Sequence, residues 1–205
     1  MPKKDPSHAG NKRNRILQAS IEVFSRKGFF GSKVSEIARA SGVADGTIYI
    51  YFKSKDDLLI SLFEEKMDEI VVEARKKVLE HSNPLDQLRA YIENHMSLLI
   101  GEAGLIEVLQ VELRQSSKFM KDYKPVKFFE YLDILGGILE EGKDAGVFRS
   151  DMNVRLARRI IFGAMDELSR TYVLSKRQKF HPTVTASEVF RLLAEGICTP
   201  GKENS

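Results

Sequence analysis

The chain has 205 residues, of which 42% are hydrophobic and 30% charged, a balance typical of folded globular proteins and unlike that of disordered ones. No run of about 18 apolar residues occurs, which argues against a membrane-spanning helix, and the N-terminal residues lack the apolar stretch of a secretory signal. The single cysteine, Cys198, can form neither an internal disulfide nor a thiolate metal cluster. We therefore expect a cytoplasmic protein without a metal site.

The net charge of +3 is unevenly distributed along the chain. Residues 1–60 hold eleven basic and six acidic side chains and so carry a local charge of +5, whereas the remainder carries −2. A basic segment attached to a nearly neutral body favours contact with a polyanion such as DNA. On charge alone, a basic segment that is merely solvated explains the pattern equally well.

Three helices are predicted in the first part of the chain, after a disordered basic tail over residues 1–11. The first has apolar residues at helical spacing and should end at Gly28, because glycine readily adopts the left-handed conformation that closes a helix. The second is predicted over residues 34–41, closed by Gly42, and the third over residues 45–51. The second and third are too short to persist without packing partners.

A long fourth helix is predicted from Ser54 to about Glu80. Its first residues, Ser-Lys-Asp-Asp, resemble a capping box with aspartate in place of glutamate. At 1.5 Å per residue the helix would be roughly 40 Å long, enough to join two subdomains. Five further helices are predicted, over residues 84–100, 105–116, 125–145, 153–168 and 184–197, the fourth of them capped by Asp151 or Asn153. The pattern predicts an all-α fold of nine helices, with a disordered tail over residues 198–205.

The two short helices on either side of Gly42 have the plan of a helix-turn-helix, whose second helix lies in the major groove of DNA. Thr47 offers a hydroxyl group and a methyl group that can touch a thymine, and Gly46 allows the backbone to approach DNA closely. Tyr49 and Tyr51 offer phenolic donors to phosphate oxygens. Lys55, in the first turn of the long helix, combines its charge with free backbone amides that favour a phosphate.

The segment GVADGTIYIYFKSKDDLL, residues 42–59, resembles the signature of the TetR family of bacterial transcriptional regulators, and the resemblance extends over residues 12–60. It implies a helix-turn-helix DNA-binding domain over residues 12–53 and a helical effector-binding and dimerisation domain over residues 54–197. The DNA-facing residues that it implies are Lys33, Ser35, Asp45, Gly46, Thr47, Tyr49, Tyr51 and Lys55. Ile48 and Phe52 would instead fill the core.

Two positions depart from the family pattern. Lys33 stands where many members have threonine, so we expect Ser32 to cap the second helix. Asp45 is negative beside a polyanion. We expect it to cap the third helix, or to accept a hydrogen bond from a cytosine amino group, rather than to bind phosphate.

Two phrases in the second half, QVELRQSSKFM at residues 110–120 and NVRLARRIIFGAMDEL at residues 153–168, resemble a narrower subgroup of the family. Its members repress fatty-acid degradation genes and release DNA on binding long-chain acyl-CoA. The resemblance implies a repressor that binds a palindromic operator as a homodimer, with long-chain acyl-CoA as effector and no other cofactor.

An acyl chain requires an apolar tunnel, and the CoA phosphates require cationic groups at its mouth. Candidates for the tunnel are Leu105, Leu109, Leu113, Phe128, Phe129, Leu132, Leu135, Phe162 and Met165. Candidates for the mouth are Arg114, Arg155, Arg158 and Arg159, with Lys118, Lys121, Lys124 and Lys127 nearby. Arg114 is preferred because it directly follows the apolar stripe. Plain core packing is the simpler explanation for most of the apolar residues, and solvation or salt bridges explain the arginines equally well.

Apolar stripes on the last two predicted helices indicate a four-helix dimer seam by resemblance to the family. Their residues are Leu156, Ile160, Ala164, Leu168, Val189, Leu192, Leu193 and Ile197. The alternative is that the stripes face the protomer's own core.

The sequence gives little support to other classes of protein. No Glu-x-x-His pair, phosphate-binding glycine loop or nucleophile elbow occurs, so we expect no enzyme activity. His81 and His95 are expected at the surface or the edge of the core. A drug-responsive repressor of efflux genes is the alternative within the family, and a helical interaction protein that does not bind DNA is a more remote one.

Overall fold

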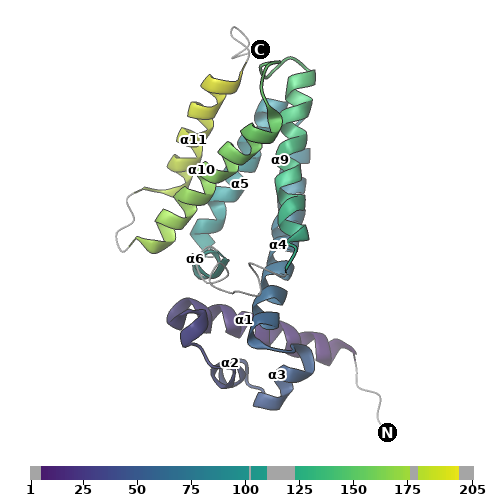
Figure 1. Cartoon of the computed structure of the whole chain (residues 1–205), viewed down its shortest axis with the longest axis vertical. Coiled ribbons are helices and arrows are strands. Elements are labelled where there is room, and N and C mark those ends of the chain that lie inside the picture. The colour runs from purple at the N-terminus through teal and green to yellow at the C-terminus, as the bar shows by residue number, and fades with distance from the viewer. Residues whose placement is uncertain (1–5, 102, 110–122, 176–179, 199–205) are drawn as a thin grey trace. The chain divides into compact units, whose positions relative to one another are not determined.

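The computed structural model describes residues 6–101, 103–109, 123–175 and 180–198 (Figure 1). Within these ranges the chain forms nine helices, and its one β-bridge pairs Phe148 with Cys198. The helices are α1 (Pro6–Gly31), α2 (Val34–Ser41), α3 (Asp45–Tyr51), α4 (Lys55–Leu79), α5 (Pro84–Gly101), α6 (Ala103–Glu107), α9 (Val126–Asp144), α10 (Val154–Leu174) and α11 (Pro182–Ile197). The predicted all-α fold is confirmed. Among the described residues no helix is long and apolar enough to cross a membrane.

Helix α1 begins earlier than the sequence predicts. It is helical from Pro6, so the prediction of a disordered tail is wrong for residues 6–11, and residues 1–5 lie outside the described part. Gly28 breaks the helix, as predicted, with φ of 73° and ψ of 161°, a conformation that residues with a Cβ rarely adopt. Residues 29–31 add a short helical turn after the break.

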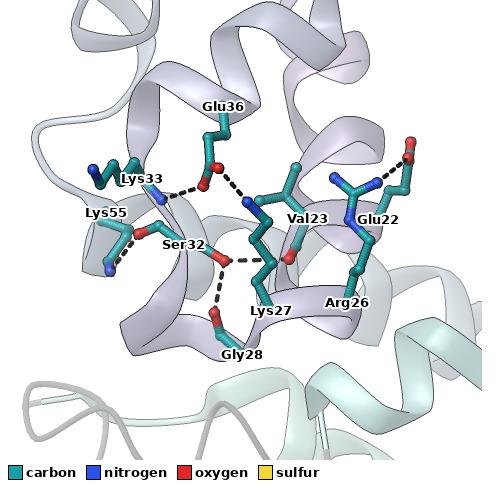
Figure 2. Close-up of polar contacts among 9 residues, drawn as sticks. All are labelled: Glu22, Val23, Arg26, Lys27, Gly28, Ser32, Lys33, Glu36 and Lys55. Atoms are coloured by element: carbon teal, nitrogen blue, oxygen red, sulfur yellow. Dashed lines mark hydrogen bonds and ion pairs between the residues drawn. The ribbon is translucent and has the colours of Figure 1, made fainter.

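Ser32 closes α1 instead of opening α2. Its hydroxyl group donates to the Gly28 carbonyl at 2.6 Å and to the Val23 carbonyl at 3.2 Å (Figure 2). The prediction that Ser32 caps α2 is therefore wrong. Lys33 occupies the N-cap position, and the Glu36 carboxylate accepts from the Lys33 backbone N–H at 3.0 Å.

The chain divides into two compact units, and the boundary falls inside α4, between Glu65 and Lys66. The first unit contains α1, α2, α3, the first part of α4, and α6; the second contains the rest of α4 with α5, α9, α10 and α11. The predicted domain boundary after residue 53 thus lies within the first unit.

In the first unit α2 packs against both α1 and α3. Ile48 and Phe52 are both buried, as predicted, and apolar residues of α1 and α2 are buried as well. Helix α6 belongs to this unit and approaches α1 at Gly104, where a Cβ would stand 3.5 Å from Ser25 Oγ and 4.0 Å from Ile21 Cγ2. Burial of these apolar faces stabilises helices that would be marginal in isolation.

The second unit is a bundle in which α5 packs against α9, α10 and α11 (Figure 1). Tyr91 and Tyr131 stack at its centre with ring centroids 4.9 Å apart, and the Tyr91 hydroxyl donates to the Tyr131 carbonyl at 3.2 Å. Asn153 caps α10, since its side chain accepts from the Leu156 N–H at 3.1 Å. Of the two predicted caps, Asn153 is the correct one.

Candidate DNA-binding and effector sites

The turn between α2 and α3 is held from outside by α1. Gly42 has φ of 66° and closes α2, while its N–H and that of Val43 donate to carbonyls in the last turn of α2. The Arg15 guanidinium donates to the carbonyls of Ser41 and Gly42. The predicted turn is confirmed, and Arg15 adds a tertiary support for it.

Helix α3 buries one face and presents the other. Ile48 is buried, whereas Asp45, Gly46 and Tyr49 are exposed, with Tyr49 57% exposed. Thr47 and Tyr51 are partly buried. An exposed polar and aromatic face on a short helix behind a tight turn is what major-groove recognition requires.

Asp45 does not cap α3. Ala44 is the N-cap residue and Asp45 the first helical residue, and the cap has no side-chain hydrogen bond. The prediction that Asp45 caps the helix is therefore wrong. The Asp45 side chain is exposed in the first turn, where the partial positive charge of the helix end favours a carboxylate.

An open concavity of about 550 Å³ lies at the converging starts of α2 and α4, beside α3. Its lining is Ser32, Lys33, Val34, Ser35, Asp45, Tyr49, Lys53, Ser54 and Lys55. It brings together five of the eight predicted DNA-facing residues and leaves out Gly46, Thr47 and Tyr51. Lys53 also lines the concavity but is not among the predicted DNA-facing residues. Its positive charge two residues before Lys55 is the signal in the sequence that could have identified it.

Lys55 is engaged within the protein. Its Nζ donates to the carbonyls of Phe29 at 2.6 Å and Ser32 at 3.0 Å, and lies 4.5 Å from the centroid of the Phe29 ring. Figure 2 shows the bond to Ser32. The predicted role of Lys55 as a phosphate ligand assumed a free ammonium group. The structure instead gives that group two carbonyl partners at the end of α1.

The start of α4 is capped nearly as predicted. The Asp57 N–H donates to Ser54 Oγ at 3.1 Å, which is the forward half of a capping box. In a capping box the Asp57 carboxylate would accept from the N–H of Ser54. Here it accepts instead from the N–H of the preceding residue, Lys53, at 2.7 Å. This pair of bonds fixes the backbone of the turn that carries Lys53.

Glu36 offsets part of the positive charge near the start of α2. Its carboxylate forms an ion pair with Lys27 and accepts from the Lys33 N–H (Figure 2). The hydrogen bond from Lys27 and then that from the Lys33 backbone lower the pKa of Glu36, so the carboxylate stays ionised. The Lys33 ammonium group points away from this pair in Figure 2.

The residues predicted to line an acyl tunnel are only partly described. Leu113 and Arg114, together with Lys118 and Lys121, lie outside the described residues, and Leu109 is half-buried in the first unit. In the second unit the Phe128 and Phe162 rings meet edge to face with centroids 5.1 Å apart. Met165 is fully buried.

The remaining tunnel candidates differ in exposure. Leu132 is half-buried, Leu105 and Leu135 are fully buried, and Phe129 is 53% exposed. Phe129 is therefore about half exposed in the protomer, and its ring meets that of Phe128 with centroids 6.0 Å apart.

His95 is a core residue, contrary to the expectation that it lies at the surface or core edge. It is 8% exposed, and its two ring nitrogens lie 2.9 Å from the Tyr131 hydroxyl oxygen and 3.3 Å from Ser169 Oγ. Burial lowers the pKa of His95 to about 4, so the ring is neutral near pH 7. The Phe162 ring lies edge-on to His95 with centroids 6.0 Å apart. This polar cluster thus borders the predicted tunnel residues.

The arginines predicted at the tunnel mouth differ in their surroundings, and one of the described ones is paired with a carboxylate. Arg158 Nη1 lies 2.6 Å from Asp133 Oδ1, whereas Arg155 and Arg159 are exposed. Arg155 and Arg158 line one concavity of about 280 Å³ between α9 and α10, together with Asp133 and Glu140. Lys127, another candidate, is paired with carboxylates on α4 and α9. A phosphate group would have to compete with Asp133 for Arg158.

Part of the predicted dimer seam is exposed in the protomer. Leu156, Ile160 and Ala164 form an exposed stripe on α10, and Leu192 is exposed on α11. Val189, in contrast, is buried in the protomer, so it belongs to the protomer core.

Two family sequence models match this chain. Residues 16–62 match the model described as "Bacterial regulatory proteins, tetR family", and residues 63–196 match "YsiA-like protein, C-terminal region" of the TetR type. The chain is also 42% identical over 183 residues to the "Fatty acid metabolism regulator protein" of Bacillus subtilis (strain 168), covering 89% of this chain and 94% of that protein. The chain belongs to the TetR family of bacterial transcriptional regulators.

Solved structures place the chain more narrowly within the family. It resembles the transcriptional regulator FadR from Bacillus subtilis in complex with stearoyl-CoA, with a TM-score of 0.84 and 41% identity over 90% of this chain and 98% of that one. It also resembles the fatty acid degradation regulator FadR from Bacillus halodurans, with a TM-score of 0.81 and 37% identity over 89% of this chain and 98% of that one. These relatives are regulators and not enzymes, in line with the class predicted from the sequence.

Proposed function

We propose that this TetR-family regulator represses fatty-acid metabolism genes in the cytoplasm, binding a palindromic operator as a homodimer and releasing it when long-chain acyl-CoA binds. The observation that carries this proposal is the similarity to a FadR that was crystallised with stearoyl-CoA, because it spans both the DNA-binding and the helical part of the chain. A similarity limited to the helix-turn-helix would support DNA binding alone, whereas this similarity covers 90% of the chain.

The first unit supports the DNA-binding part of the proposal. The exposed face of α3 and the lysine-lined concavity beside it supply the two kinds of contact that specific binding needs. Thr47 and Gly46 would face base edges, while Ser35, Tyr49 and Tyr51 would contact the phosphate backbone.

The second unit supports a lipid-like effector. Phe128 and Phe162 offer aromatic edges next to the buried Met165, and apolar walls of this kind suit an acyl chain. Arg155, and Arg158 if released from Asp133, would meet the CoA phosphates. Arg114 keeps its predicted role at the mouth of the tunnel.

The exposed stripe of α10 supports a homodimer. Leu156 and Ile160 are large apolar side chains without a cover in the protomer, and dimerisation would bury them. One α3 helix reads too few base pairs for specificity, so two half-sites about 34–36 Å apart are expected.

Two elements support communication between effector and operator. Helix α4 contributes residues to both units without a break, and α6 belongs to the unit of α1, where a side chain at Gly104 would meet Ser25 and Ile21. An acyl chain that shifted either element would change the spacing of the two α3 helices in the proposed dimer. By linkage, operator binding must weaken acyl-CoA binding by the same factor, typically about 5–150-fold.

The test is a titration of a labelled operator complex with acyl-CoAs of increasing chain length. Release should strengthen with length, since each buried methylene contributes roughly 0.8 kcal/mol, and free CoA should act poorly. Native mass spectrometry of the freshly purified protein should show a dimer carrying acyl-CoA. Release by cationic drugs, with no dependence on acyl length, would favour the efflux-type alternative instead.

A further inference from the structure

The two isoleucines of α3 lie in opposite environments. Ile48 is buried in the first unit, whereas Ile50 is 71% exposed. An apolar side chain stabilises a fold through the surface that it buries, so Ile50 contributes little to the stability of the unit. Single exposed apolar residues are common on protein surfaces and need no explanation by themselves. The position of Ile50 on α3, in contrast, is informative.

Ile50 lies near the centre of the exposed face of α3. An α-helix turns about 100° per residue, so Gly46 and Ile50, each two residues from Ile48, both lie about 160° around the helix from it. Thr47 and Tyr49 flank this face, each about 100° from Ile48. Gly46 has nothing within 4 Å of the position where a Cβ would stand. The centre of the exposed face is thus a bare stretch of backbone beside one aliphatic side chain.

An aliphatic side chain in this place matches one feature of DNA. It neither donates nor accepts a hydrogen bond, so it can bind neither a phosphate group nor the polar edge of a base. The apolar group that bases present in the major groove is the C5 methyl group of thymine. Packing this methyl group against Ile50 removes both from water, which favours the contact. The missing side chain at Gly46 allows the DNA to approach closely enough for it.

We infer that Ile50 is a specificity-determining residue, which recognises the methyl group of one thymine in each half-site of the operator. This inference rests on the proposed DNA binding through α3 and adds to it an apolar contact with a base. Thr47 also carries a methyl group, but it is partly buried and lies on the flank of α3. Its hydroxyl group suits the polar edge of a base, so the two residues read different groups.

The experiment removes the methyl group from the DNA and the aliphatic side chain from the protein. A duplex is first selected from a pool of random sequence with the wild-type protein. Each thymine is then replaced by deoxyuridine, symmetrically in both half-sites, which deletes the methyl group and keeps the base pairing. Binding is measured for the wild type, for Ile50→Ala and for Thr47→Ser, which deletes only the methyl group of Thr47. Val72→Ala, at an exposed site on α4, controls for shortening an exposed side chain elsewhere.

At one thymine of each half-site, deoxyuridine should weaken wild-type binding. The expected loss is about fifteenfold, because burial of one methyl group changes affinity about fourfold and the dimer makes the contact twice. Ile50→Ala should bind the parent duplex more weakly and should be indifferent to this replacement. Thr47→Ser and Val72→Ala should keep the full loss. Thermal unfolding of Ile50→Ala should match that of the wild type, since the side chain is exposed.

The inference is overturned if no replacement weakens wild-type binding, or if Ile50→Ala shows the same loss as the wild type at every thymine. The proposed function has a separate outcome. A protein that enriches no sequence from the random pool would overturn the proposed DNA binding itself, whereas a selected duplex that is indifferent to deoxyuridine overturns only the role of Ile50.

Discussion

The imidazole of His95 and the phenol of Tyr131 lie 2.9 Å apart in the core of the second unit, with Ser169 on the other side of the imidazole. Each ring nitrogen thus faces a hydroxyl group, and burial keeps the ring neutral by lowering the pKa of His95 from its ordinary 6.5 to about 4. A neutral imidazole between two hydroxyl groups can satisfy both of its nitrogens, whereas a buried imidazolium would require a counter-charge.

Acid should destabilise the protein through His95. The pKa is lower in the folded state, so between pH 6.5 and about 4 the unfolded chain binds the extra proton and the free energy of unfolding falls as the pH falls. The full effect of this group would be about 3 kcal/mol, from roughly 1.4 kcal/mol per pKa unit. Urea unfolding at a series of pH values measures it. His95→Gln should flatten this part of the profile, and His81→Gln, at an exposed site, should not.

Two glycines of α9 should respond oppositely to alanine. A Cβ at Gly142 would lie 2.2 Å from two ring carbons of Phe148, which is fully buried, so the ring or the helix would have to shift. Gly142→Ala should therefore destabilise the protein by about 1–3 kcal/mol. Gly137 has nothing within 4 Å of its Cβ position, so Gly137→Ala should stabilise the helix by roughly 0.5–1 kcal/mol. Thermal unfolding of both variants provides the comparison, and a shift in the same direction would contradict it.

Thr47→Ala and Tyr49→Phe should separate specificity from affinity. Tyr49→Phe removes a phosphate donor and should weaken binding to all duplexes alike, by about 1.5 kcal/mol per contact or roughly tenfold. Thr47→Ala removes a base-edge contact and should change the ranking of operator sequences. Binding to a set of operator variants with single base changes measures both. A uniform loss with Thr47→Ala would remove Thr47 from the base-reading set.

Breaking the Asp133–Arg158 pair should affect ligand binding in two directions. Asp133→Asn frees Arg158 of its carboxylate and should raise the affinity for acyl-CoA by a factor of roughly 1.4 to 5, since an exposed ion pair is worth about 0.2–1 kcal/mol. Arg158→Gln should lower that affinity. Calorimetric titration with one acyl-CoA checks both variants. Equal losses in both would mean that the pair acts only in holding α9 to α10.

The oligomeric state should depend on Ile160. This residue is 65% exposed in the protomer, so Ile160→Glu should fold normally yet shift the protein toward monomer by placing two charges in the seam. Leu79→Glu, at a site that is 80% exposed on α4, is the matched control and should stay dimeric. Sedimentation at micromolar concentration distinguishes the two. A dimeric Ile160→Glu variant would place the seam elsewhere.

Local signals in the sequence sufficed for most helix limits. Gly28, Gly42 and Asn153 close or open helices where predicted, because each acts through its own backbone or a bond to a residue three positions away. Ser54 likewise caps α4 through Asp57. Such interactions involve only residues close together in the chain, so they can be predicted from the sequence alone.

The errors arose where partners lie far apart in the chain. Lys55, predicted as a phosphate ligand, bonds to Phe29, 26 residues away. Arg158 on α10 donates to Asp133 on α9, which lies 25 residues away in the chain. His95 could be placed in the core only once the hydroxyl groups that satisfy it were known. Side-chain periodicity does not identify such partners.

The close approach of α6 to α1 at Gly104, where a side chain would meet Ser25 and Ile21, limits how this chain can be recombined with other members of the family. A chimaera that joins another regulator's N-terminal helices to this effector body would keep α6 but exchange the surface on which it rests. Such a chimaera exchanges one continuous N-terminal segment, whereas the first unit consists of two separate segments of the chain, one of which contains α6. A graft that carries the two facing surfaces of α1 and α6 together should remain responsive to ligand, whereas one that exchanges α1 alone should bind DNA without releasing it.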